Sequence, residues 1–325
     1  MTGDGVKERL NSFSYLLRTE LRSISNSARR FGALFLRSWR QNIRNSHIIL
    51  LRLSGSIVQA ALFAQIFTSV RDDKSLTKSI ADRVALLTYG VINMSIMALM
   101  KTLDLFAKER SVVMREQMRS NYYSLEYLLA KVFAEIPLDS FFALVFAALL
   151  KRLTGLRTST WTLIKTYCVM TVTSVSLGFA VGSVTSSVES AMSLGVPIIV
   201  IFMVVGVINP SGVGDDDQPN LVMKLLKTAS PIKWAIEALV TAEFRGMEFG
   251  ESDRGRWGEL LNLPKMGALA MVKDGDNVLR NLGLGTAEYS DLLEKLGILS
   301  GVYLFISWLG LTFFLPSFID TEEVQ

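Results

Sequence analysis

The chain has 325 residues, of which 50% are hydrophobic and 20% charged, with a formal net charge of +4. Soluble domains have a similar share of apolar residues and about 25% charged residues, so composition alone does not separate a soluble from a membrane protein. A single Cys (Cys168) and a single His (His47) exclude an intrachain disulfide and a Cys/His zinc site, and His47 is the one histidine that any Ser/His or Cys/His catalysis would have to use.

The N-terminal segment, residues 1–46, holds nine basic and three acidic residues. It is too long and too charged for a signal peptide, and its positive charge predicts a cytoplasmic N-terminus. Within it, residues 28–45 combine Phe31, Leu34 and Trp39 with five arginines. This pattern predicts either an amphipathic helix along the inner membrane surface or a plain juxtamembrane anchor, and both interpretations place the segment at the membrane.

Six apolar stretches follow, each close to the length of about 20 residues that a transmembrane helix needs. They are Ile48–Val70, Val84–Phe106, Ile136–Leu150, Trp161–Val184, Ala191–Ile208 and Leu296–Phe318. Ser, Thr and Tyr residues in the second, fourth and sixth stretches are typical of helices that pack on each other or line a cavity. The alternative, buried helices of a large soluble protein, is disfavoured because the rest of the chain offers too little amphipathic helix to cover them.

Six spans predict a topology with both termini in the cytoplasm. The stretch 107–133 would be cytoplasmic, and the long segment 211–295, with 14 acidic and 10 basic residues, would be outside. Residues 151–159 conflict with this topology, because they hold three basic residues and no acid on the predicted outer side. The predicted domains are therefore a cytoplasmic segment 1–46, a six-span domain 47–318 and a cytoplasmic tail 319–325.

A nucleotide site is not predicted in this chain. A P-loop needs a Gly-Lys dipeptide, and the sequence contains none. The acidic run Asp215–Asp217 lacks the spaced ligands of a calcium loop and is interpreted as a solvated loop. We expect no cofactor and no metal in this chain, and no nucleic-acid partner.

The stretch after the second span carries charges of both signs at helical spacing, among them Glu109, Arg115 and Glu116, and Lys131 and Glu135 form an i,i+4 pair. A charged cytoplasmic helix between two spans suits docking of a soluble partner, although the charge pattern alone equally describes a solvated loop helix.

Two separate motifs resemble those of ABC transporters of the G subfamily, and the resemblance covers roughly residues 30–318. The run Arg37, Arg40, Arg44 and Asn45 resembles the approach to that family's first span. The motif residues are Glu109-Arg110, Arg115-Glu116, Tyr122-Tyr123, Tyr127, Ala130-Lys131, Glu135 and Pro137 after the second span, and Ser230-Pro231, Trp234, Glu237-Ala238, Glu243-Phe244 and Gly246 before the last.

The resemblance implies an all-α, polytopic membrane protein with six transmembrane helices, an N-terminal amphipathic connecting helix, a cytoplasmic coupling helix and a re-entrant helical segment before the last span. It also implies pairing with a second membrane domain, as a homodimer or heterodimer. In the family a nucleotide-binding domain precedes each membrane domain. That domain is absent from this sequence, so ATP and Mg²⁺ are expected on a partner or missing domain, in cis or in trans. The segment 211–295 contains no Cys, so the disulfides of some relatives cannot form here.

Site residues follow from the resemblance position by position. Asn93 and Ile96 match residues that face the substrate cavity, and Met94, Met97 and Phe202 would add a soft apolar wall. The alternatives are an interhelical hydrogen bond for Asn93 and simple packing for the others. Coupling to the nucleotide-binding domain is assigned to Glu109, Arg115 and Glu116. Asp139, an acid at the start of the third span, is expected to pair with Arg152 or Lys131 or to lie at the interface.

The resulting prediction is the membrane-spanning permease part of an ATP-driven exporter of lipophilic or amphipathic substrates, such as a lipid, sterol, pigment or drug-like molecule, working by alternating access as a dimer. One alternative is a non-transporting membrane remnant or scaffold of a former transporter. Another is a passive channel or membrane enzyme, which would carry more ionisable mid-span residues than Lys101, Asp104 and Asp139.

Overall fold

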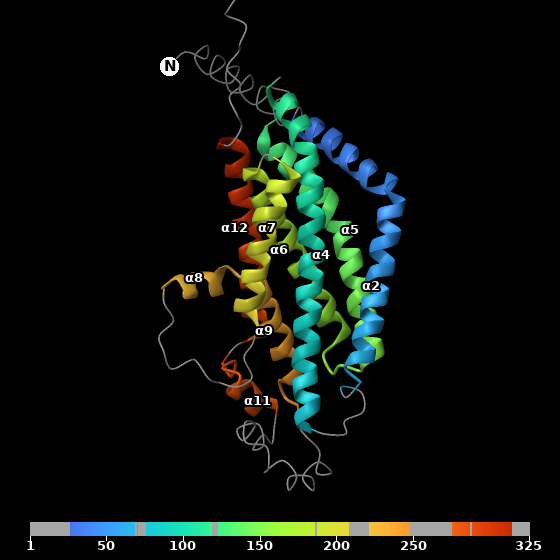
Figure 1. Cartoon of the computed structure of the whole chain (residues 1–325), viewed down its shortest axis with the longest axis vertical. Helices are drawn as coiled ribbons and strands as arrows, with labels where there is room; N and C mark the ends of the chain where they lie inside the picture. Colours follow the sequence, from blue (N-terminus) through green and yellow to red (C-terminus); the bar gives the residue numbers. More distant parts are fainter. Residues whose placement is uncertain are drawn as a thin grey trace, which may run out of the picture. The chain divides into compact units, whose positions relative to one another are not determined.

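The computed structural model describes residues 27–68, 70, 76–118, 123–185, 187–207, 221–247, 275–286 and 288–313 (Figure 1). Within these residues every element of regular secondary structure is a helix, which confirms the predicted all-α class for this part of the chain.

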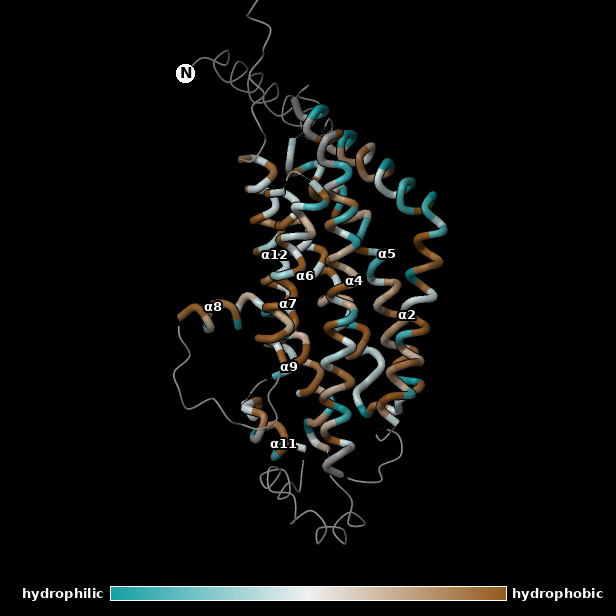
Figure 2. The backbone as a smooth tube through the Cα atoms, viewed as in Figure 1, coloured by the Kyte–Doolittle hydropathy of each residue, from teal (hydrophilic) through white to brown (hydrophobic). Residues whose placement is uncertain are grey.

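Six helices are long and apolar enough to cross a membrane, in agreement with the six predicted spans. They are α2 (Ser46–Ile66), α4 (Leu76–Met118), α5 (Ser124–Thr154), α6 (Thr160–Val184), α7 (Val188–Gly206) and α12 (Tyr289–Phe313). Hydrophobic residues dominate most of the length of α2, α7 and α12 (Figure 2). The protein is therefore an integral membrane protein, and the predicted end of the last span at Phe318 lies outside the described residues.

Two helices extend well beyond their apolar stretches. In α4 the apolar candidate span covers Ser79–Phe106, but the helix runs on to Met118, and the stretch 107–118 contains no Gly or Pro that would end it earlier. In α5 the helix starts at Ser124 and passes through Pro137, near which the sequence predicted the third span to begin. The charged stretch predicted as a separate short helix therefore forms, where it is described, the end of α4 and the start of α5.

The described residues divide into two compact units. Unit 1 comprises residues of Met1–Ser46 and Ser111–Pro137, and unit 2 comprises residues of His47–Arg110 and Leu138–Gln325. Unit 1 contains a helix over residues 27–44, here called the N-terminal helix, which matches the helix predicted over 28–45.

The N-terminal helix packs against α5 within unit 1. Phe31 makes an edge-to-face contact with Phe133, with ring centroids 6.2 Å apart. Leu34, Ser38 and Asn42, spaced four residues apart on one helix face, are buried. One face of this helix is thus covered by protein, and the predicted contact with the membrane surface stays a prediction.

Helix α6 forms the centre of unit 2, where it packs against α12, α9 and α7. Small hydroxyl residues make these contacts close: Ser176 lies 3.0 Å from Ser300 of α12 (Oγ to Oγ), and Ser174 lies 2.9 Å from Ser95 of α4. Such pairs satisfy polar groups between helices in a membrane, as the Ser- and Thr-rich fourth span predicted.

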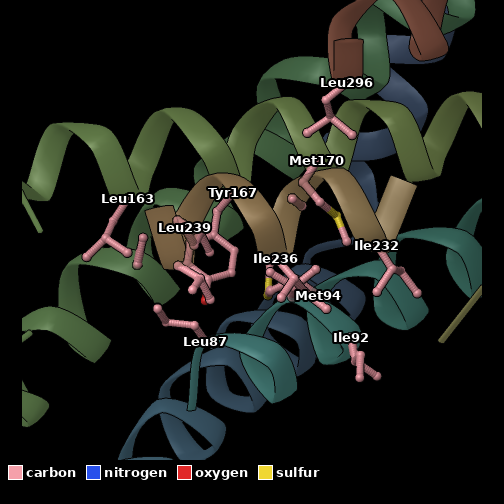
Figure 3. Close-up of a cluster of buried hydrophobic side chains, with 14 of the residues drawn as sticks. Leu87, Ile92, Met94, Leu163, Tyr167, Met170, Ile232, Ile236, Leu239 and Leu296 are labelled. Carbon is pink, nitrogen blue, oxygen red and sulfur yellow. The ribbon is translucent and has the colours of Figure 1, made fainter. Parts of the chain in front are cut away.

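In the segment predicted as an external loop, 211–295, the described residues form α8 (Leu221–Ala229), α9 (Pro231–Phe244), α11 (Gly275–Asn281) and the start of α12. The side chain of Ser230 caps α9 by accepting from the Lys233 N–H (3.2 Å), and Pro231 occupies the first turn. In α9, Ile232, Ile236 and Leu239 are buried in the core of unit 2 (Figure 3), and whether the segment lies outside or re-enters the membrane stays a prediction. The acidic run 215–217 lies outside the described residues.

Candidate functional site

A bidentate ion pair joins the N-terminal helix to the end of α4 in unit 1. The Arg37 Nη1 atom donates to both carboxylate oxygens of Glu116, at 2.8 and 2.9 Å. Both side chains are partly exposed, so the pair itself contributes little to stability, of the order of 1 kcal/mol or less. Its geometric effect is larger, because it fixes the position of α4's last turn against the N-terminal helix.

A second, buried contact joins the N-terminal helix to α5. The Asn42 amide donates to the Glu135 Oε1 atom (3.1 Å) and to the Ala134 carbonyl (3.3 Å). Glu135 also faces Lys131, 3.6 Å away on the same helix, which confirms the predicted i,i+4 pair. Because Lys131 and Glu135 are almost completely buried, their ion pair and the Asn42 hydrogen bond to Glu135 offset part of the cost of burying these charges.

The three predicted coupling residues lie in different surroundings. Glu109 is half-buried on α4, Arg115 is exposed, and Glu116 pairs with Arg37. Arg37 was not among the predicted coupling residues, since nothing in a spacing of 79 residues points to this contact.

The predicted cavity residues do not share one surface: Phe202 lies on α7, and the other four lie on α4 with different neighbours. Asn93 donates to the Gln59 Oε1 atom of α2 at 2.7 Å, and the Met97 methyl group faces Gly55, also on α2, where an added Cβ would lie 3.7 Å from it. Met94 instead belongs to the buried core of unit 2 (Figure 3), as does Phe202 of α7. Ile96 is partly buried against the same core.

Asp139 forms the centre of an ionic cluster between three candidate membrane helices. Its carboxylate accepts from Arg52 Nη1 of α2 (2.6 Å) and from Lys101 Nζ of α4 (3.0 and 3.1 Å). The Arg52 guanidinium also stacks on the Phe142 ring, 4.5 Å from its centroid. The expected partners of Asp139, Arg152 or Lys131, are therefore wrong: the partners lie on neighbouring helices.

Glu243, in the second sequence motif, forms another buried cluster. Its carboxylate accepts from Arg83 Nη1 (2.5 Å), from the backbone N–H groups of Arg157 and Thr158 (3.0 and 2.8 Å), and from the Thr158 hydroxyl (2.5 Å). Arg83 in turn donates to the Val70 carbonyl and to the Ser79 hydroxyl. This cluster holds α9 to α4 and to the turn between α5 and α6.

Metal binding finds no support among the described residues, where no group of three or more His, Cys, Asp or Glu side chains comes together.

Comparison with known proteins gives the family. The model of the ABC-2 type transporter family matches residues 29–244. The chain belongs to this family. It is 35% identical to ABC transporter G family member 7 of Arabidopsis thaliana over 68% of its own length and 30% of the relative's. It is also 27% identical to protein white of Drosophila melanogaster, over 68% of this chain and 32% of that protein.

The ABC-2 type membrane domain here is thus similar to those of G-family members, as the two sequence motifs indicated. The chain spans about a third of the length of the curated relatives it matches.

Proposed function

We propose that this membrane permease domain exports a lipophilic or amphipathic substrate by alternating access, as one half of a dimer, with ATP and Mg²⁺ bound by nucleotide-binding domains in cis or in trans. In this proposal the N- and C-termini lie in the cytoplasm, in line with the basic N-terminal segment. Helices α8 and α9 provide the re-entrant segment on the other side of the membrane.

The observation that carries the proposal is the construction of unit 1. Three helical segments rich in charge are tied together by the Arg37–Glu116 pair and by the buried contact of Asn42 with Glu135. Two of these segments are direct continuations of candidate membrane spans, α4 and α5. A displacement imposed on unit 1 by a soluble domain therefore reaches the spans through unbroken helices.

This construction refines the roles of the coupling residues. Arg115, which is exposed, is proposed to contact the nucleotide-binding domain, together with Glu109. Glu116 is proposed to act through Arg37: their ion pair keeps the end of α4 in position beside the N-terminal helix.

The substrate cavity is proposed on the α4 face that bears Asn93, Ile96 and Met97, where polar and flexible apolar groups lie together. Met94 and Phe202 are buried in the single chain and are proposed to reach the cavity only after rearrangement of the dimer.

The test uses the chain assembled with a nucleotide-binding domain of the same family in liposomes, with ATP hydrolysis and efflux of a fluorescent phospholipid as readouts. We expect neither activity from the chain alone and both from the assembly. The double substitution Glu109→Ala with Glu116→Ala should reduce efflux more than ATP hydrolysis. The reason is that it weakens the coupling between the two domains and leaves the nucleotide-binding domain itself unchanged.

Exchanging the charges of Arg37 and Glu116 tests whether Glu116 acts through its ion pair with Arg37 or contacts the nucleotide-binding domain directly. Arg37→Glu and Glu116→Arg should each impair efflux, and the two together should restore it, since the pair is rebuilt in reverse. Efflux by the chain alone, or unchanged efflux in the double alanine variant, would contradict the proposal.

A further inference from the structure

The Asp139 cluster has an unusual balance of hydrogen bonds for a group of charges inside candidate membrane spans. Asp139 is 1% exposed, whereas the Arg52 and Lys101 side chains retain 12% and 16% exposure. Among the described residues Arg52 uses one of its five N–H donors, the Nη1 bond to Asp139. An N–H donor left without an acceptor at membrane depth is costly, so the remaining donors call for a ligand from outside the chain.

The distance of the cluster from the ends of the candidate spans indicates which ligand groups can reach it. Arg52 lies six residues after Ser46, the first residue of α2, and Lys101 lies five residues before Phe106, the end of the candidate span in α4. At 1.5 Å per residue, both lie roughly 8 to 9 Å inside the span ends. A long basic side chain at this depth reaches the boundary between acyl chains and headgroups, where lipid phosphates lie.

The surroundings of Arg52 also face lipid rather than protein. Leu50 and Leu51 on α2 and Phe141 on α5 are exposed, although each is large and apolar. Such residues on a candidate span suit contact with acyl chains, and a phosphate attached to those chains would offer Arg52 an acceptor from outside the chain.

The charge of the cluster indicates an anionic ligand. The three side chains of the cluster contribute two positive charges and one negative charge. The neighbouring Asp104 and Lys108 pair with each other (2.7 Å) and cancel. A guanidinium binds phosphate oxygens through paired donors, and the ammonium of Lys101 adds a second positive charge nearby.

We propose that Arg52 and Lys101 bind the phosphate of an acidic phospholipid in the leaflet next to the N-terminal end of α2, with Asp139 holding the two cations in place. The Glu243 cluster provides the contrast within the same unit. There Arg83 is 6% exposed and donates to three protein acceptors, whereas Arg52 donates to one. The site requires neither nucleotide nor a second chain, so it stands independently of the proposed export function.

The experiment is native mass spectrometry of the full chain in detergent, titrated with phosphatidylglycerol, phosphatidylcholine or inorganic phosphate. We expect phosphatidylglycerol to bind more tightly than phosphatidylcholine, and inorganic phosphate not to displace it, because a free ion has no acyl chains to hold it at this depth. Displacement by inorganic phosphate, or equal binding of both lipids, would overturn the proposal.

Three variants test the roles of the residues. Arg52→Gln should weaken phosphatidylglycerol binding roughly tenfold, the size expected for the loss of one charge-assisted contact, while Lys101 still compensates Asp139. Asp139→Asn should strengthen binding, because both cations then lose their internal competitor. Arg152→Gln, which removes an exposed basic residue at the other end of α5, is the matched control and should bind as the unaltered chain does.

The opposite signs distinguish a lipid site from a merely structural ion cluster. A structural role alone predicts that Arg52→Gln and Asp139→Asn both weaken binding by loosening the fold, and that outcome would overturn the proposal. If Asp139→Asn does not fold, Arg52→Lys replaces it: this variant keeps the charge but loses the fork of donors. It should bind between the unaltered chain and Arg52→Gln, and binding equal to the unaltered chain would contradict the role of the guanidinium.

Discussion

Asp139 and Glu243 are two carboxylates buried in the same unit, but their surroundings differ. Four donors converge on Glu243, and the arginine that pairs with it is itself bonded to two further protein acceptors. Within the described part of the chain, Asp139 accepts hydrogen bonds from two cationic side chains and from no backbone N–H group, and both cations keep an exposed surface.

The difference shows what a buried ion cluster does in each place. In the Glu243 cluster the hydrogen-bond partners belong to the protein, so the cluster holds helices together. Removing one member leaves an uncompensated buried charge. At the Asp139 cluster, where Arg52 donates to one protein acceptor, we propose that a lipid phosphate completes the cluster, so the loss of one member should cost less. Burial of the carboxylate alone, which is nearly complete in both, does not separate the two cases.

The largest expected effect on stability comes from disrupting the Glu243 cluster. Glu243→Ala leaves the buried Arg83 without its carboxylate and frees two backbone N–H groups, so we expect a loss of about 3–5 kcal/mol in stability. The midpoint of thermal unfolding in detergent measures it, with Glu294→Ala, which removes an exposed carboxylate on α12, as the control. A midpoint equal to that of the control would remove the distinction between the two clusters.

Equivalent substitutions of the two arginines compare the clusters directly. Arg83→Gln should cost about 3 kcal/mol because the buried Glu243 loses the cation that pairs with it, whereas Arg52→Gln should cost about 1 kcal/mol because Lys101 continues to compensate Asp139. The same thermal unfolding assay in lipid-free detergent gives both values. Equal losses, or the reverse order, would show that the two clusters are alike.

A smaller loss of stability is expected when one hydrogen bond of the Glu243 cluster is removed. Thr158→Val keeps the volume of the side chain but removes the hydroxyl that donates to Glu243 Oε2, while the backbone N–H of residue 158 still donates. We expect a loss of about 1–2 kcal/mol. Thr228→Val, an exposed threonine at the end of α8, serves as the control and should leave the unfolding midpoint nearly unchanged.

The smallest effect concerns a third carboxylate, Glu237 on α9, which has neither type of surrounding. Burial raises the pKa of its carboxyl above the ordinary 4.5, and Lys233, 3.7 Å away, opposes part of that shift. Because the folded state then binds the proton more tightly than the unfolded state, stability falls as the pH rises from 4.5 through the raised pKa.

Glu237→Gln should remove this fall. The unfolding midpoint of the variant, relative to that of the unaltered chain, should therefore increase from acid towards neutral pH. A difference that stays constant with pH would show that Glu237 titrates as it does in the unfolded chain.

Much of the fold could be predicted because it depends on neighbours in the chain. The six spans follow from contiguous apolar residues, the start of α9 from the Ser230-Pro231 pair, and the Lys131–Glu135 contact from helical spacing. In each case the pitch of a helix or its capping geometry determines which atoms meet, and both are local properties.

Tertiary structure alone decided the partners of the charges. Arg37 and Glu116 are 79 residues apart, Arg52 and Asp139 are 87 apart, and Arg83 and Glu243 are 160 apart. Which side chains meet across such distances depends on the rotation of each helix about its axis. Asn93 faces α2 while its neighbour Met94 enters the core, since adjacent residues differ by about 100° around a helix. Apolar content marks a span, but only packing determines which side of it meets protein and which meets lipid.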